Sequence, residues 1–151
     1  PPFLLLLDGI QDPHNFGAII RSAYAAGIHG IVIPKRRAVG VNSTVVKTSG
    51  GYASKMPIAR VTNMAKTIEW LKAKNIWVAG ADMNGDMTLF NGDMKGAFAI
   101  VMGSEGSGIS RLVREKCDFI ISIPMLNGVE SLNASVAASL IVYEAFRQRS
   151  K

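Results

Sequence analysis

Short apolar runs alternate along this chain with stretches of helical periodicity. Most of the apolar runs lack alternating polar residues, which is typical of strands covered on both faces in a parallel sheet. The runs lie at Phe3–Leu7, Gly30–Ile33, Ile58–Val61, Ile76–Ala81, Phe98–Met102 and Phe119–Ile123. We therefore expect six buried strands in this order.

The stretches between these runs have the period of amphipathic helices. They cover Phe16–Ala26, Ser43–Thr48, Asn63–Ala73, Ser110–Lys116 and Ala134–Arg149. Thr62 is placed to cap the third of these helices, Gly27 to end the first, and Asn84-Gly85 to form a turn. Such alternation predicts the α/β class, with a mostly parallel sheet and helices on both faces.

Length and composition suit one domain. The 151 residues are 48% hydrophobic, enough to bury one substantial core, so we expect a single compact domain over residues 1–151. No apolar run approaches the ~20 residues that cross a bilayer, and Phe3–Leu7 lacks the flanks of a signal peptide. These features predict a cytoplasmic protein. Because Pro1 stands where an initiator methionine is expected, we interpret the chain as part of a longer one.

The formal net charge of +6 favours a polyanionic partner. Lys and Arg side chains that contact phosphates release condensed counterions, so nucleic acid is the leading candidate. A solvated basic surface is the plainer explanation for a domain of this size. The cluster Lys35-Arg36-Arg37, which follows an expected strand, adds to the nucleic-acid interpretation.

Cysteine and histidine form no metal or catalytic motif in this sequence. Cys117 is the single cysteine and has no Cys or His at metal-ligand spacing, so we interpret it as a buried structural thiol. His14 and His29 lack a Ser or Asp partner at a diagnostic spacing. We predict no metal site and assign neither histidine.

Three polar loops follow three of the expected strands. Ligands of open α/β sheets bind at the carboxyl ends of strands, so the loops after Leu7, Met102 and Ile123 should form one composite site. The first strand–helix turn has no Gly-x-Gly-x-x-Gly, Gly103–Gly108 has that spacing reversed, and no Walker loop is present. The ordinary NAD and ATP interpretations are therefore weakened.

The third loop leads into the long C-terminal helix. Ser131 and Asn133 can both cap that helix, whose first N–H groups from Ala134 onward lack partners within the helix. Free donors of this kind suit a polar or anionic ligand.

Three polar residues of these loops also have plainer interpretations. Asn15 opens the first expected helix, where an N-cap role explains it without any function. Arg21 lies away from the apolar stripe of the same helix, as an ordinary exposed arginine would. Glu105 lies among glycines that let a backbone approach a ligand closely, or it is a solvated carboxylate in a turn. Both interpretations of Glu105 stay open.

Together the three loops resemble the motifs of the SpoU class of SPOUT RNA methyltransferases, which transfer a methyl group from S-adenosylmethionine to a ribose 2′-hydroxyl. The motifs are Asp12–Ala23 (DPHNFGAIIRSA), Val101–Gly108 (VMGSEGSG) and Ile123–Ala137 (IPMLNGVESLNASVA). The resemblance runs from about Phe3 to Arg149. Val32–Lys35 and Arg60–Asn63 look most like the bacterial members that methylate a guanosine of 23S ribosomal RNA; a transfer-RNA substrate is the alternative.

The resemblance implies a set of site residues. The catalytic candidates are Asn15, Arg21, Glu105, Ser131 and Asn133, and the cofactor-binding candidates are Gly103, Ile123, Met125, Leu132 and Asn133. An apolar cleft with a few backbone donors and acceptors can hold adenine and fix the sulfonium for in-line attack. S-adenosylmethionine brings its own electrophile, which fits the lack of a metal motif.

The family implicates the arginine that matches Arg21 in removing the ribose proton. A guanidinium hardly ever deprotonates in a protein, so a literal general-base role is difficult to accept. Our hypothesis is that Arg21 grips the adjacent RNA phosphate and orients the hydroxyl, while Glu105 or Ser131 helps to hold that geometry.

The resemblance also implies features that periodicity does not indicate. These are a deep trefoil knot in the C-terminal segment, although threaded chains are rare, and a homodimer with its interface near the cofactor site. The apolar residues of the last helix give it broad coverage that can serve the core and a partner subunit together. They are Val136, Leu140, Val142, Tyr143 and Phe146.

Two departures from close relatives affect the expected RNA contacts. Such relatives carry a separate RNA-binding domain before the first strand, and we expect part of the RNA selectivity to lie in a domain that this chain lacks. Glu130 also stands where relatives commonly have a small or apolar residue.

Two other functions remain as alternatives. A basic α/β module that binds RNA without modifying it predicts no affinity for the methyl donor. A nucleotide-dependent enzyme that uses Gly103–Gly108 for phosphate predicts NAD or ATP binding. Methyl transfer accounts for all three loops together.

Overall fold

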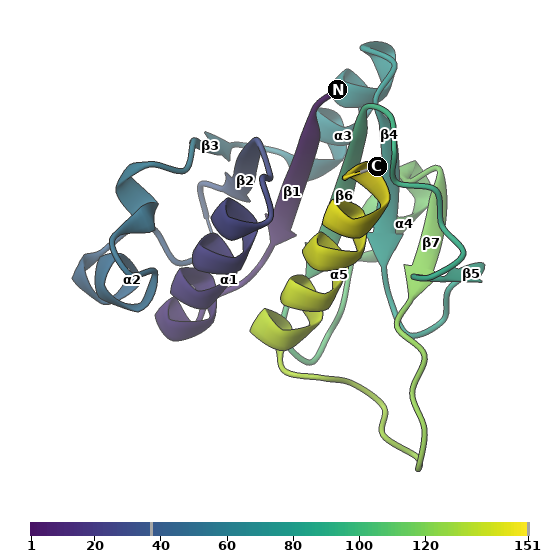
Figure 1. The fold of residues 1–151 in the computed structure, drawn as a ribbon. Coiled ribbons are helices and arrows are strands. Elements are labelled where there is room, and N and C mark those ends of the chain that lie inside the picture. The colour runs from purple at the N-terminus through teal and green to yellow at the C-terminus, as the bar shows by residue number, and fades with distance from the viewer. Residues whose placement is uncertain (37, 151) are drawn as a thin grey trace.

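The structure, a computed structural model, describes residues 1–36 and 38–150. Within these residues seven strands form one sheet in the order β3-β2-β1-β6-β4-β7-β5, in which all neighbouring strands are parallel (Figure 1). They are β1 (Phe3–Asp8), β2 (Gly30–Pro34), β3 (Ile58–Val61), β4 (Trp77–Ala81), β5 (Met87–Thr88), β6 (Phe98–Gly103) and β7 (Phe119–Ser122).

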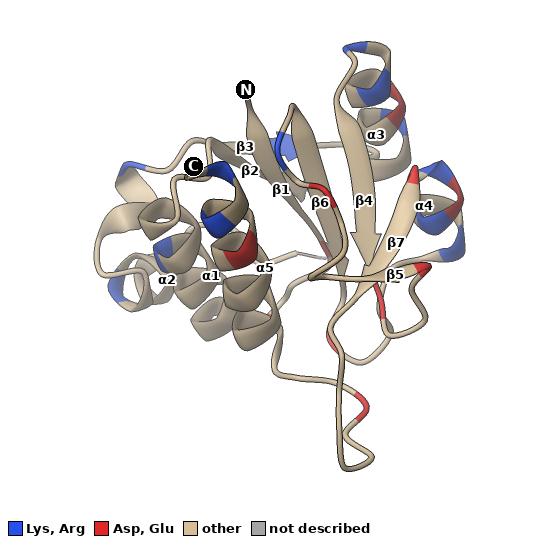
Figure 2. Cartoon of the chain, turned by 45° about the vertical axis from the view of Figure 1, so that its right-hand side comes forward, with Lys and Arg blue, Asp and Glu red and all other residues tan. Residues whose placement is uncertain are grey.

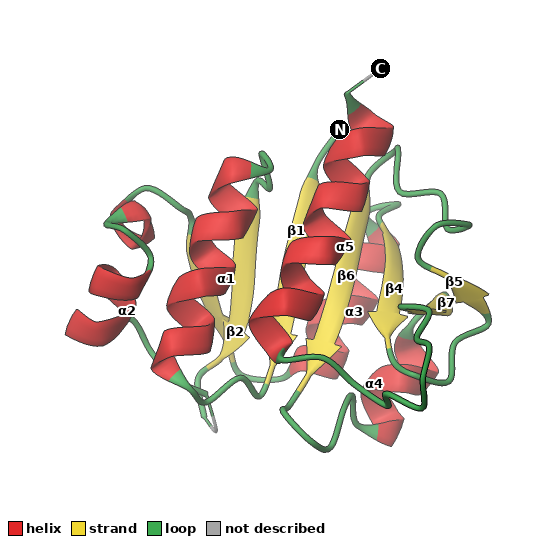
Figure 3. Ribbon diagram, turned by 60° about the horizontal axis from the view of Figure 1, so that its bottom comes forward, coloured by secondary structure: helices red, strands yellow, loops and turns green. Residues whose placement is uncertain are grey.

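Helices cover both faces of this sheet (Figure 3). They are α1 (Pro13–Ala25), α2 (Ser43–Thr48), α3 (Met64–Ala73), α4 (Arg111–Lys116) and α5 (Ala134–Arg149), with a 3-10 turn, η1, at Tyr52–Ser54. Along β1, Leu5 and Leu7 join the core that α1 and α5 cover, whereas Leu6 joins the core under α3 and α4. The α/β class and the two-sided sheet predicted from the sequence are confirmed.

Two local predictions differ from the structure. Asn63, not Thr62, caps α3, because its side chain accepts a hydrogen bond from the backbone N–H of Lys66 at 3.0 Å. The two residues of β5 pair with β7 but belong to no apolar run, so periodicity did not indicate them. Gly27 follows the end of α1 with φ +79°, which confirms it as the stop.

The parallel register brings several strand ends to one edge of the sheet. Asp8 at the end of β1 lies beside Gly103 at the end of β6, and Ala81 of β4 lies beside Ile121 of β7. The loops that follow these strands therefore leave the sheet at the same edge, where Figure 1 shows the long connection from β7 to α5. This edge is where the expected composite site would form.

The C-terminal end of α5 contacts the amino edge of the sheet through Arg149. The Arg149 guanidinium donates to the carbonyls of Met94 at 3.0 Å and Gly96 at 2.7 Å, and also to that of Pro1. The Cζ atom of Arg149 lies 5.3 Å from the centre of the Phe3 ring. No helix among the described residues is long and apolar enough to span a membrane.

Candidate functional site

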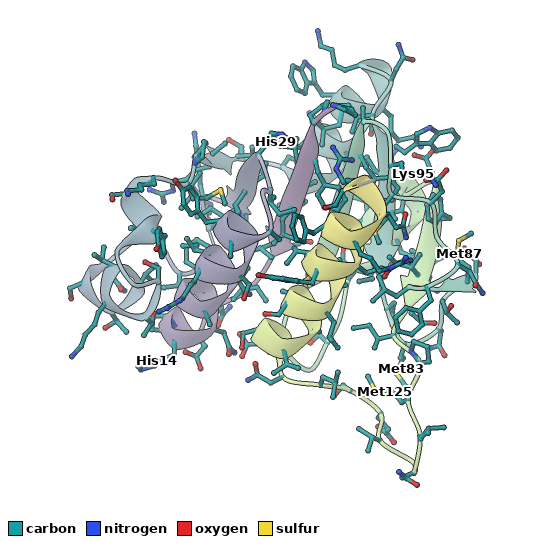
Figure 4. All side chains as sticks on the ribbon, viewed as in Figure 1. His14, His29, Met83, Met87, Lys95 and Met125 are labelled. Atoms are coloured by element: carbon teal, nitrogen blue, oxygen red, sulfur yellow. The ribbon has the colours of Figure 1, made fainter. Side chains whose placement is uncertain are left out.

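A cavity of about 710 Å³ opens at the carboxyl edge of the sheet. Its walls come from the loops after β4, β6 and β7, from the first turns of α5 and from Asn15 of α1. Met83 and Met125, both in the wall, lie near each other at this edge in Figure 4. The volume falls within the roughly 300–1,000 Å³ of small-molecule sites.

Most of the site residues predicted from the sequence line this one cavity. They are Asn15, Gly103, Glu105, Ile123, Met125, Ser131, Leu132 and Asn133. The first motif contributes Asn15 to the cavity lining. The loop after β1 packs against the second motif, because a Cβ on Gly9 would lie 3.1 Å from Cβ of Ser104. The three loops thus meet at one edge, as predicted.

Asn15 connects the first motif to the second. Its side-chain Nδ2 donates to Oε2 of Glu105 at 3.0 Å, and the Asn15 side chain is buried. The N-cap interpretation of Asn15 is wrong, because Asp12 caps α1 by accepting from the backbone N–H of His14 at 2.8 Å. Asn15 is therefore inside the first turn, with its amide directed to Glu105.

Glycines allow the second motif to fold back on itself. Ser104 and Gly108 form an antiparallel bridge through N–H···O bonds of 3.2 and 3.0 Å. A Cβ on Gly103 would lie 2.0 Å from the carbonyl carbon of Gly108, so no larger residue fits. Gly106 and Gly108 have positive φ, which L side chains rarely adopt. The resulting tight loop presents Glu105 to the cavity.

The start of α5 forms another wall. The Asn133 side chain accepts from the N–H groups of Ser135 at 2.9 Å and Val136 at 3.4 Å, so Asn133 is the N-cap, whereas Ser131 is not. These two N–H groups, expected to be free for a ligand, are thus occupied by the protein. The expectation that these two donors are free is wrong, whereas a polar or anionic ligand at this helix start stays a prediction.

The loop after β4 is a wall that the sequence reasoning missed. Asp82 and Met83 both line the cavity. From α4, Arg114 donates through Nη1 to Oδ2 of Asp82 at 2.7 Å and through Nη2 to the carbonyl of Asn84 at 2.5 Å. Asp82 directly follows a buried strand, so the rule that gave the other three loops also pointed to it.

Arg21 is not among the residues that line the cavity. It is exposed on α1, and its Nη1 would lie 3.0 Å from a Cβ on Gly50, just beyond α2. The exposed position agrees with the apolar stripe read from the sequence. Its catalytic role stays a prediction.

Carboxylates are the charged groups at the cavity. Asp82, Glu105 and Glu130 line it, and burial raises the pKa of Asp8, at the end of β1. Among residues 1–36 and 38–150, no three His, Cys, Asp or Glu side chains gather as a metal site.

Cys117 and His29 have structural surroundings away from this cavity. Burial raises the Cys117 pKa to about 11, and its Sγ lies 3.3 Å from the carbonyl of Val113, to which the thiol donates. His29 accepts through Nδ1 from the N–H of Phe3 at 2.9 Å, at the amino end of β1. His14 lies far from it, at the start of α1 (Figure 4).

The long helix α5 divides its apolar residues between core and surface. Val142 is buried, whereas the remaining four expected residues are each close to half exposed: Val136, Leu140, Tyr143 and Phe146. Tyr143 and Phe146 contact each other edge to face, with ring centres 5.9 Å apart. This leaves an apolar strip along α5 that no other part of the described chain covers.

Comparison with known proteins gives relatives over nearly the whole chain. The SpoU rRNA Methylase family profile matches residues 2–143. The chain is 54% identical to YacO of Bacillus subtilis, named for the TrmH family, and 51% identical to the 23S rRNA (guanosine-2′-O-)-methyltransferase RlmB of Escherichia coli K12. Both matches cover 99% of this chain, but 60% and 61% of those proteins. The chain thus spans about three fifths of these curated relatives.

A solved structure with a bound ligand is also similar. The SpoU methyltransferase AviRb of Streptomyces viridochromogenes, crystallised with the cofactor AdoMet, superposes with a TM-score of 0.89. It is 36% identical, and the match covers 96% of this chain and 59% of AviRb.

Proposed function

Because the chain belongs to the SpoU rRNA Methylase family, we propose that it transfers a methyl group from S-adenosylmethionine to a ribose 2′-hydroxyl of RNA. The observation that carries this proposal is the meeting of three motifs at one cavity. Asn15, Glu105 and Asn133 come from widely separated parts of the sequence and line the same space. An RNA-binding module with merely structural glycine loops gives no reason for that convergence.

The proposed substrate is a guanosine of 23S ribosomal RNA. Its support is the 51% identity with Escherichia coli RlmB over 99% of this chain. A transfer RNA is the second candidate, because the name of YacO includes tRNA as well as rRNA.

The cavity suits the proposed cofactor, which supplies an electrophilic methyl group when bound. Apolar side chains of Ile123, Leu132 and Ile141 offer a surface for an adenine ring. Carboxylates of Asp82 and Glu130 offer partners for an ammonium group. These features, together with the AdoMet complex of AviRb, support cofactor binding at Gly103, Ile123, Met125, Leu132 and Asn133.

The polar residues of the cavity would orient the RNA hydroxyl. The Asn15 amide occupies Oε2 of Glu105, which leaves Oε1 to accept a hydrogen bond from the ribose. Ser131 offers a hydroxyl in the same cavity. Arg21 would hold an adjacent phosphate as a bidentate cation rather than accept the proton.

Two features of the assembly belong to the same proposal. A homodimer would cover the apolar strip of α5, whose four side chains are each about half exposed. The C-terminal segment would form the deep trefoil knot of the SPOUT fold. RNA selectivity would rest partly on a separate RNA-binding domain, as the family resemblance implies.

Methyl transfer can be tested with purified protein, S-adenosylmethionine and in-vitro-transcribed fragments of 23S ribosomal RNA. Nuclease digestion followed by mass spectrometry should detect a 2′-O-methylated guanosine. Transfer RNA in a parallel reaction separates the two candidate substrates. RNA binding without methylation of either substrate, from protein that fails to bind S-adenosylhomocysteine, would favour the non-catalytic module.

A further inference from the structure

The positive charge of this protein is concentrated in one continuous segment. Residues 13–68, called the basic segment below, contain eight Lys and Arg and neither Asp nor Glu, which gives it a formal charge of +8. The remaining nine cations face all eleven carboxylates, a formal charge of −2. The whole excess of positive charge therefore lies in the basic segment.

The described cations of the basic segment also form no ion pair, although Lys66 lies near enough to Glu69, just outside the segment, to help Lys116 lower the pKa of that carboxyl. The cations that form ion pairs among the described residues all lie outside this segment; they are Lys72, Lys95, Arg111, Arg114, Lys116 and Arg147. The seven described cations of the segment are all exposed and none takes part in these pairs; they are Arg21, Lys35, Arg36, Lys47, Lys55, Arg60 and Lys66. Arg37, the eighth, lies outside the described residues.

Most of the basic segment forms one side of the molecule. It builds α1, β2, α2, η1 and β3, whereas the start of α3, with Lys66, lies on the other face of the sheet. In Figure 2 the elements α1, α2 and β3 carry blue and no red. Solvated positive charges without carboxylates among them attract a polyanion over a wide area.

Lys35 and Arg36 lie at the same edge of the sheet as the cavity. They directly follow β2, which pairs with β1, and β1 pairs with β6 at the cavity. Two strand spacings separate β2 from β6, or about 10 Å. The Lys35 backbone is fixed there, because its N–H donates to Val61 at 2.8 Å and its carbonyl accepts from Arg60 at 3.3 Å.

The cavity itself has the opposite charge. Asp82 is paired with Arg114, but Glu105 and Glu130 line the cavity without a cation in the ion pairs of the described residues. Phosphates would therefore be repelled there, while an uncharged ribose and base would not. We propose that the basic segment is the surface that binds the RNA backbone, with Lys35 and Arg36 on the phosphates next to the reacting nucleotide. This inference rests on the proposed function and adds the location of the RNA.

The test compares two charge-matched double variants. Lys35→Gln/Arg36→Gln removes two cations of the basic segment; Lys95→Gln/Arg111→Gln removes two exposed cations that are paired with Asp93 and Glu115. Affinity for a fluorescein-labelled hairpin of 23S ribosomal RNA is measured by anisotropy over a range of KCl concentrations. Calorimetry with S-adenosylhomocysteine checks that each variant is folded at the cavity.

The first variant should weaken RNA binding roughly tenfold at low salt. It should also lower the slope of log affinity against log salt by about 1.4, or ~0.7 for each phosphate that the variant no longer neutralises. The control should change affinity less than about twofold. An unchanged slope in the first variant, or equal losses of affinity in both, would overturn the proposal. If the wild type binds RNA in this pattern without binding S-adenosylhomocysteine, the surface stands and the proposed function fails.

Discussion

The Asn15 side-chain amide donates to the Glu105 carboxylate at 3.0 Å, although 90 positions separate the two residues along the chain. The bond joins the first turn of α1 to the tight loop after β6 at the wall of the cavity. We therefore propose that Asn15 positions Glu105, whose second carboxylate oxygen would accept a hydrogen bond from the ribose hydroxyl.

Replacing Asn15 should impair turnover more than cofactor binding. In Asn15→Ala the Glu105 carboxylate loses a buried partner and its fixed direction, and a displacement of about 1 Å can lower a rate ~100-fold. We expect kcat for methyl transfer to fall by about that factor, while affinity for S-adenosylhomocysteine changes little. Ser22→Ala, which removes the 2.8 Å contact from α1 to Ser139 of α5, is the control. Normal kcat in Asn15→Ala would refute the positioning role.

Gly103→Ala should disrupt the cavity. The added methyl would lie 2.0 Å from the carbonyl carbon of Gly108, so the bridge between Ser104 and Gly108 must open. Overpacking of this kind typically costs about 1–3 kcal/mol. We expect a lower Tm and loss of S-adenosylhomocysteine binding. Gly96→Ala meets no atom within 4 Å and should behave as wild type; equal behaviour of both variants would contradict the steric argument.

Arg114 lies outside the cavity lining, but its contacts with the loop after β4 predict that replacing it weakens ligand binding in the cavity. Arg114→Met frees Asp82 and the carbonyl of Asn84, and charge-assisted bonds contribute roughly 1.5–3 kcal/mol. We expect the Kd for S-adenosylhomocysteine to rise about tenfold, equivalent to ~1.4 kcal/mol. Arg111→Met, on the same helix but paired only with exposed Glu115, should leave Kd unchanged. An effect of similar size in both variants would show that α4 charge, not the loop, matters.

Asp8 predicts a pH-dependent stability. Burial raises its pKa above the ordinary 3.8, so the folded state binds its proton more tightly than the unfolded state. Ionising Asp8 therefore lowers the free energy of unfolding. This loss is absent below the pKa of Asp8 in the unfolded state, grows as the pH rises through its pKa in the folded state, and is constant above that. Asp8→Asn should therefore stabilise the protein in urea unfolding at pH 7, with a gain that shrinks towards pH 3. A gain that is independent of pH would contradict this cause.

The sequence predicted the strand and helix order because buried parallel strands and amphipathic helices have distinct periods. It also predicted that the loops after Leu7, Met102 and Ile123 share an edge, since parallel strands end together. The sequence did not predict which side chains form hydrogen bonds between distant parts of the chain. The bond from Asn15 to Glu105 depends on Asp12 taking the capping position, a choice that propensity alone leaves open between two good capping residues.

Other parts of the site depended on tertiary contacts that no local pattern records. Arg114 reaches Asp82 across 32 positions, and β5 exists only through its pairing with β7. The N–H groups at the start of α5 were expected to be free because they lack partners within the helix, but the side chain of Asn133 accepts from two of them. The sequence named both Ser131 and Asn133 as possible caps, and the fold selects Asn133.

The most direct measurement is a calorimetric titration of the purified chain with S-adenosylhomocysteine, with NAD and ATP as controls. The cavity is lined by residues of this chain, so the binding that we propose there should not require an additional RNA-binding domain. We predict saturable binding of S-adenosylhomocysteine only, which Gly103→Ala abolishes and Gly96→Ala retains. No binding by folded protein, or equal binding of NAD or ATP, would contradict the assignment of the cavity to the methyl donor.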